Sequence, residues 1–91
     1  MTTLSQNVPN PFNPTTTISF NTAAVGRVKL SIFDATGKHV RTLVDDNVSA
    51  GVQSAMWDGR DAAGTAVSSG VYFYRLTTNA VTHTKKMGLL K

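Results

Sequence analysis

The sequence contains no cysteine, no glutamate and no long hydrophobic run. Without cysteine, the chain has neither a disulfide framework nor a thiolate metal site. No apolar stretch approaches the roughly 18 residues that a membrane-spanning helix requires. All five acidic residues are aspartate, which favours turns, whereas glutamate favours helices. These absences indicate a domain of short elements separated by turns.

The length of 91 residues, 41% of them hydrophobic, suffices for one domain with a modest core. The net charge is +4, and most of the nine basic residues are dispersed along the chain. Only Lys85, Lys86 and Lys91 gather, at the C-terminal end, where they form either ordinary solvated surface or a basic docking end. The first residues lack a signal-peptide pattern, so we expect any export signal to lie upstream of Met1.

Alternation of hydrophobic and polar residues predicts β-strands. The clearest strand covers residues 27–33, where Val28, Leu30 and Ile32 share one face. The same alternation predicts strands at residues 15–21, 38–44, 52–57, 65–67, 71–77 and 81–90. Turn residues separate these segments, including a longer loop at residues 45–51, and none keeps a helical period. We therefore predict an all-β, immunoglobulin-like antiparallel β-sandwich of about seven strands.

Residues 1–14 differ from the rest because prolines and asparagines alternate there. The motif consists of Pro9, Asn10, Pro11, Phe12, Asn13 and Pro14. Proline pushes the residue before it toward extended backbone, and asparagine readily closes turns. We expect an ordered segment or a linker in residues 1–14 and the sandwich domain in residues 15–91. Phe12 is expected to plug the open end of the sandwich, with a burial contribution of about 2 kcal/mol.

No group of residues predicts catalysis or a metal site. His39 and His83 lie far apart on predicted strands without ligand partners nearby, so we expect both to face solvent. Asp58, Gly59 and Asp61 resemble a calcium loop only faintly, and turns closed by the aspartates are the favoured interpretation. A nucleophile elbow and a convergent carboxylate pair are both missing. We predict that the domain is not an enzyme and uses no cofactor.

The large aromatic residues allow two interpretations. Trp57, Tyr72 and Tyr74 alternate in phase with other apolar residues, which predicts core positions, with the tyrosine hydroxyls reaching the rim. The alternative is a sugar-binding platform of exposed rings. Phe73 and Arg75 form only a weak version of the interleaved aromatic and basic face that binds single-stranded nucleic acid, so no nucleic-acid partner is expected.

Several stretches resemble a known family. They are residues 8–18, 32–37, 57–61, 70–76 and 85–91. Together they are similar to the type A C-terminal sorting domain of the type IX secretion system, over nearly the whole chain from about residue 7. The middle part, from Trp57-Asp58-Gly59-Arg60-Asp61 to Gly70-Val71-Tyr72-Phe73-Tyr74-Arg75-Leu76, also resembles the immunoglobulin-like domain of flagellar hook-capping proteins, though more weakly.

The resemblance to the sorting domain implies a role in export. Such domains stand at the C-terminus of cargo proteins in Gram-negative bacteria, largely of the Bacteroidetes type. The cargo passes through the periplasm, crosses the outer membrane and ends at the cell surface or is secreted. The implied partners are an outer-membrane translocon with its shuttle β-barrel, a sortase-like protease and the cargo fused upstream. The domain itself is not expected to insert into a membrane.

The same resemblance implies roles for individual residues. The recognition end comprises Lys85, Lys86, Met87, Leu89, Leu90 and Lys91, and residues 9–14 mark the start of the domain. Apart from the resemblance, the alternation and the turn residues predict core or turn positions for Trp57, Asp58, Gly70, Tyr72 and Tyr74, with a positive φ expected at Gly70.

Gly88 departs from the family pattern, which commonly has a larger apolar residue there. We therefore expect a weakened or bulged last strand. The backbone of that strand is expected to offer an edge for strand addition by a partner. A structural spacer or assembly module of immunoglobulin-like type and a carbohydrate-binding module of a cell-surface protein remain as alternatives.

Overall fold

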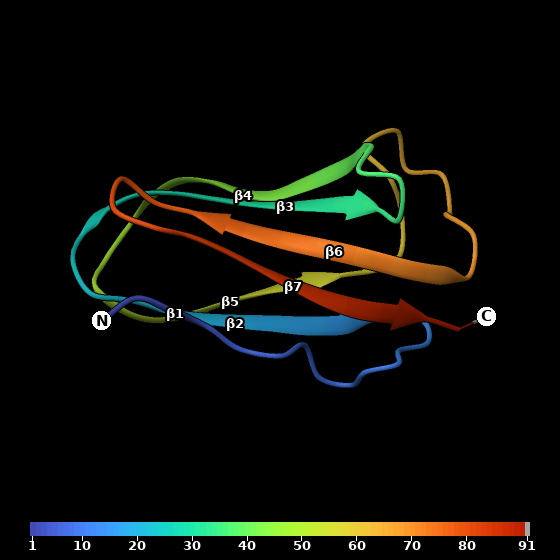
Figure 1. Cartoon of the computed structure of the whole chain (residues 1–91), viewed down its shortest axis with the longest axis horizontal. Coiled ribbons are helices and arrows are strands. Elements are labelled where there is room, and N and C mark those ends of the chain that lie inside the picture. The colour runs from blue at the N-terminus through green and yellow to red at the C-terminus, as the bar shows by residue number, and fades with distance from the viewer. Residues whose placement is uncertain (91) are drawn as a thin grey trace.

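The structure, a computed structural model, describes residues 1–90 and consists of two facing antiparallel sheets (Figure 1). The first sheet has the order β1-β2-β5, formed by β1 (Thr3–Leu4), β2 (Thr16–Thr22) and β5 (Gly51–Trp57). The second has the order β4-β3-β6-β7, formed by β4 (His39–Val48), β3 (Gly26–Asp34), β6 (Gly70–Thr77) and β7 (Thr82–Leu89). The predicted all-β sandwich is confirmed. Residues 1–90 contain no helix that could cross a membrane.

The core lies between the sheets and follows from the two-residue period of the strands. On β3, Val28, Leu30 and Ile32 point inward as predicted, and none is more than 2% exposed. Trp57, at the end of β5, is fully buried, and its ring centroid lies 5.3 Å from that of Tyr72. The indole N–H of Trp57 donates a hydrogen bond to the carbonyl of Arg60 at 2.9 Å. The polar atom of this large side chain is therefore satisfied inside the core.

The burial of Trp57, Tyr72 and Tyr74 bears directly on the sugar-binding interpretation. Their side chains are 0%, 6% and 0% exposed, respectively. Stacking against a sugar requires a ring face open to solvent, and these rings face the opposite sheet. None of the three can serve as the platform that the carbohydrate-binding alternative required.

Strand β4 departs from the simple alternation that predicted it. Its pairing with β3 contains two register shifts, one between Leu30 and Ser31 and one between Ile32 and Phe33. Two bulged residues, Val40 and Leu43, pack against the core. The prediction of a loop at residues 45–51 is wrong for residues 45–48. These mostly polar residues continue β4 and pair with β3 at the edge of the sheet. Edge strands accept such residues since one side faces water.

The seven strands are not all the predicted ones. Residues 65–67 contribute only an isolated bridge between Arg60 and Ala66, within the long connection from β5 to β6. The additional strand is β1, which pairs with β2 and lies inside residues 1–14, the part expected to be an ordered segment or a linker. The N-terminus lies at one end of the long axis, and β7 ends at the opposite end (Figure 1).

Replacing Trp57 with alanine is expected to destabilise the domain by about 3–5 kcal/mol, because a fully buried aromatic side chain leaves a cavity. Urea unfolding followed by fluorescence of the tyrosines or by circular dichroism measures the change. The matched control replaces the neighbouring Met56, whose side chain is 67% exposed, with alanine. This change is expected to lower the free energy of unfolding by less than about 0.5 kcal/mol. Equal losses in the two variants would contradict the position of Trp57 in the core.

Candidate recognition surface

Strand β7 carries most of the tail motif, residues 85–91, and lies at the edge of the four-stranded sheet. Its side chains alternate: Met87 and Leu89 point into the core and are at most 2% exposed. Lys86 and Leu90 are exposed on the outer side, and Lys85 is half-buried. Lys91, also assigned to the recognition end, lies outside the described residues. The strand therefore presents two kinds of residue, of which only the outward ones can contact a partner.

The outer edge of β7 is covered by the proline motif, residues 9–14. The backbone N–H of Phe12 donates to the carbonyl of Gly88 at 3.0 Å, and the N–H of Leu90 donates to the carbonyl of Phe12 at 3.0 Å. The N–H of Gly88 donates to Oδ1 of Asn10 at 2.9 Å. Nearby, Nε2 of Gln6 donates to the carbonyl of Lys86 at 2.8 Å. The proline motif and the tail motif, which belong to two of the stretches that resemble the sorting domain, thus form one surface, although they stand at opposite ends of the sequence.

This arrangement corrects two expectations about β7. Its backbone edge is not open to strand addition between Lys86 and Leu90, because the proline motif and Gln6 already occupy it. Gly88 forms no bulge, since the pairing of β6 with β7 continues without a register shift. A Cβ atom at Gly88 would lie 3.6 Å from Cβ of Pro11, an ordinary contact. A larger residue at this position would therefore rest on Pro11 rather than disrupt the strand.

The N-terminal segment is held in place by buried polar contacts that the sequence did not reveal. Asn7 is 1% exposed, and its Nδ2 donates to Oγ1 of Thr16 and to the carbonyl of Pro9, each at 3.0 Å. The backbone N–H of Asn7 donates to the Tyr74 hydroxyl at 2.9 Å, and that hydroxyl donates to the carbonyl of Ser5 at 2.7 Å. Burial raises the pKa of Tyr74, and the hydrogen bond from Asn7 opposes part of this increase.

Phe12 anchors the other end of the segment. Its side chain is 1% exposed, and its ring centroid lies 5.4 Å from that of Trp57. The expectation that Phe12 plugs the open end of the sandwich is confirmed. Because the ring is buried while the backbone pairs with Gly88 and Leu90, the position of the proline motif is fixed from two sides.

A shallow hollow of about 250 Å³ lies where the proline motif meets β7. It is lined by Asn10, Pro11, Val71, Lys86, Met87 and Gly88. Val71 and the nearby Leu90 are 45% and 56% exposed, respectively. Among the described residues that line this hollow, Lys86 alone carries a charge. The geometry suits an apolar contact bordered by the Lys86 cation.

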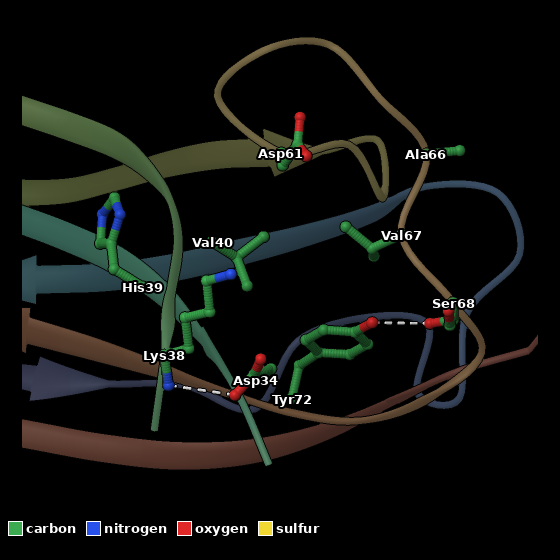
Figure 2. A pocket seen from close by; sticks show the side chains of 9 residues that line it. All are labelled: Asp34, Lys38, His39, Val40, Asp61, Ala66, Val67, Ser68 and Tyr72. Atoms are coloured by element: carbon green, nitrogen blue, oxygen red, sulfur yellow. Dashed lines mark hydrogen bonds between the residues drawn. The ribbon is translucent and has the colours of Figure 1, made fainter. Parts of the chain in front are cut away.

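A second hollow, of about 330 Å³, lies beside the turn that follows β3 (Figure 2). Oδ1 of Asp34 accepts hydrogen bonds from the hydroxyl and the N–H of Thr36, and the hydroxyl bond is the main reason that the pKa of Asp34 is lowered. Oδ1 of Asp61 accepts from two backbone N–H groups of its own turn. The Tyr72 hydroxyl donates to the carbonyl of Ser68 at 2.6 Å. These contacts close turns, as expected for Asp61, and residues 1–90 contain no cluster of metal-ligating side chains.

The two histidines differ from each other. His39 is exposed as expected, and its Nε2 lies 2.8 Å from Oγ1 of Thr42. His83 is half-buried, and its Nε2 is a buried atom without a hydrogen-bond partner among the described residues. The expectation of a solvent-facing His83 is wrong because His83 is in phase with Met87, on the inner side of β7.

Comparison with known proteins agrees with this architecture. The family model that matches, over residues 5–81, is that of the FlgD Ig-like domain. FlgD of Xanthomonas campestris is 27% identical, with a TM-score of 0.67, over 96% of this chain and 64% of that chain. No curated protein sequence matches the chain.

Two proteins of Porphyromonas gingivalis contain a domain of the same fold. PorU is 20% identical, with a TM-score of 0.79 over 99% of this chain. PorZ is 22% identical, with a TM-score of 0.61 over 94% of this chain. The chain spans only 9% of the PorU chain and 11% of the PorZ chain. At these identities the likeness shows the fold alone.

Replacing Asn10 with alanine is expected to increase hydrogen exchange of the Gly88 amide roughly fivefold, because the lost hydrogen bond is worth about 1 kcal/mol. Exchange followed by NMR measures this effect at a single amide. The control is Asn13→Ala, an exposed residue in the same motif, which should leave Gly88 unchanged. An unchanged rate in the Asn10 variant would contradict the contact.

The raised pKa of Tyr74 predicts a pH dependence of stability. The folded state binds the Tyr74 hydroxyl proton more tightly than the unfolded state does. The contribution of this hydroxyl to the free energy of unfolding is therefore complete below about pH 10, the unfolded pKa, and is lost as the pH rises through the folded pKa. Tyr74→Phe should lose about 1–3 kcal/mol at neutral pH, because Asn7 and Ser5 each lose a hydrogen-bond partner.

The free energies of unfolding of the wild type and of Tyr74→Phe should therefore approach each other in alkaline solution. Denaturant titrations at a series of pH values measure the difference. Tyr72, whose pKa is also raised by burial, is present in both proteins and cancels in the comparison. Two parallel curves would show that the Tyr74 hydroxyl does not couple folding to pH.

Proposed function

The chain belongs to the FlgD Ig-like domain family, and from this premise we propose that it is a C-terminal sorting domain of the type IX secretion system. In this role it directs an attached cargo protein across the outer membrane through the type IX secretion translocon. The small share of PorU and PorZ that the domain spans is consistent with a module of larger proteins. PorZ is itself described as an essential surface component of that secretion system.

The observation that carries the proposal is the contact between the proline motif and the tail motif. The resemblance to sorting domains is most specific in these two stretches, and backbone hydrogen bonds connect them at Phe12, Gly88 and Leu90. A recognition signal must be presented in a fixed geometry if a partner is to distinguish it from an unstructured basic tail. The buried ring of Phe12 provides that fixed geometry.

The partner in this proposal contacts side chains rather than a free strand edge. The exposed Leu90 and Val71 supply apolar contact area, and Lys86 supplies the charge. The proposed partners are the outer-membrane translocon with its shuttle β-barrel, and a sortase-like protease. The proposed path leads from the periplasm to the cell surface or the medium. No catalytic role and no nucleic-acid partner belong to this proposal.

A second candidate function is that of a structural assembly module of the FlgD kind. It is favoured by the family model and by the likeness to FlgD of Xanthomonas campestris, a protein described in connection with hook capping in flagellar assembly. That likeness is to the immunoglobulin-like domain, and the family model ends at residue 81, before the tail motif. The two functions therefore differ in whether the tail motif is needed.

A secretion assay tests the proposal with a fluorescent protein fused ahead of residues 1–91, in a host with the matching translocon. Deletion of residues 86–91 is a poor test, because it removes the core residues Met87 and Leu89 together with the exposed ones. The double variant Lys86→Glu with Leu90→Asn changes only outward side chains. It should lower export at least roughly fivefold, since it reverses the charge and removes the apolar contact.

The matched control is Lys38→Glu with Val52→Asn, which makes the same chemical changes at exposed positions elsewhere. It should export normally, and thermal unfolding should show both variants folded. Retention of the unaltered fusion in the periplasm would overturn the sorting function and favour the assembly module. Normal export of the Lys86 and Leu90 variant would show that the tail motif is not what the translocon recognises.

A further inference from the structure

The outer face of the four-stranded sheet carries a hollow of about 180 Å³, which lies beside the recognition surface and is lined by other residues. It is lined by Lys29, Ser31, Phe33, His39, Arg75 and Thr77. We call this the cationic hollow. Two of its lining residues are linked through Thr42, because Oγ1 of Thr42 lies 3.1 Å from Oγ of Ser31 and 2.8 Å from Nε2 of His39.

Arg75 is held over the face of Phe33, with its guanidinium carbon 4.5 Å from the ring centroid. His39 meets the same ring edge-on, at a centroid distance of 5.7 Å. A stacked guanidinium has its plane fixed, while the N–H donors around its rim stay free for bidentate bonds to an oxyanion. The Arg75 guanidinium and the rings of Phe33 and His39 thus form one ordered group on this face of the sheet.

Positive charge dominates this part of the face. Lys29 and Arg75 are diagonal neighbours across the β3–β6 pair, since Arg75 stands opposite Ser31 and Lys29 opposite Thr77. Such neighbours are about 7–8 Å apart, close enough to bind one anionic group together. Asp45 stands opposite Lys29 in the β3–β4 pair. Its carboxylate forms an ion pair with Arg27, whose Nη2 lies 2.7 Å from Oδ1 of Asp45.

Apolar side chains continue from the hollow toward β7. Phe73 stands opposite Phe33 in the sheet and opposite Lys86 on the other side, and it is half-buried. Val71, next but one along β6, is 45% exposed. A ligand that spans this face would therefore contact the cations Lys29 and Arg75 and, next to them, the apolar side chains of Phe73 and Val71.

We propose that the cationic hollow binds an acidic peptide segment of a partner protein, with a carboxylate seated between Lys29 and Arg75. Charge complementarity selects an anion, and the neighbouring Phe73 and Val71 favour one that carries apolar side chains, as a peptide does. A single-stranded nucleic acid needs free ring faces for base stacking, and the face of Phe33 is covered by Arg75. This site does not depend on the proposed sorting function, because it makes no use of the translocon.

The test is titration of the full chain with a short labelled peptide of Asp, Leu and Ser at low ionic strength. Fluorescence anisotropy measures the affinity, and amide NMR shifts locate the peptide. We expect shifts at Lys29, His39 and Arg75, and weaker binding as salt increases. Arg75→Lys and Lys29→Ala should each weaken binding roughly tenfold or more, because a charge-assisted hydrogen bond is lost.

Lys38→Ala is the matched control, since it removes the same charge from an exposed turn outside the hollow. It should bind as the wild type does, and a peptide with Asn in place of Asp should not bind. Equal weakening by Lys38→Ala and Lys29→Ala would mean general charge attraction and would overturn the site. Tighter binding of an oligothymidylate or of dextran sulfate than of the acidic peptide would also overturn it.

Discussion

The structure depends on the way that Phe12 joins the two sheets at the end where β7 terminates. Its ring is buried against Trp57, the last residue of β5 in one sheet, while its backbone is bonded to Gly88 and Leu90 of the other. Phe12 thereby pairs with the edge of β7, where Asn10 and Gln6 also bond, and closes the core beneath it. A row of unpaired backbone groups invites pairing with other chains, and here the chain's own N-terminal segment fills it.

Polar satisfaction and hydrophobic burial support each other along this segment. Asn7 is buried but fully engaged with Pro9, Thr16 and Tyr74. A buried amide without partners would cost stability, so the segment is held in one conformation rather than attached loosely. The surface that it forms with β7 consequently has a defined shape, which is what a recognition module requires.

Local alternation predicted the strands that follow a strict two-residue period, such as β3 and β6, together with their inward residues. It located β4 but missed the two bulges in it and its continuation to Val48, and it missed β1, which is too short to show a period. For the candidate site, the sequence indicated both motifs but not their contact. Pairing between Phe12 and Leu89 is a long-range event, and neither residue carries a local signal for it. The buried Asn7 was missed because an isolated asparagine predicts a turn.

The position of the N-terminus has a consequence for any protein joined ahead of this domain. The chain begins at one end of a body 37 Å long, and β7 terminates at the other (Figure 1). A folded neighbour attached before Met1 would sit far from Lys86, Leu90 and the proline motif. Its size and shape would therefore have little steric influence on the surface formed by β7 and the proline motif. A domain of this kind could therefore be joined to many different proteins.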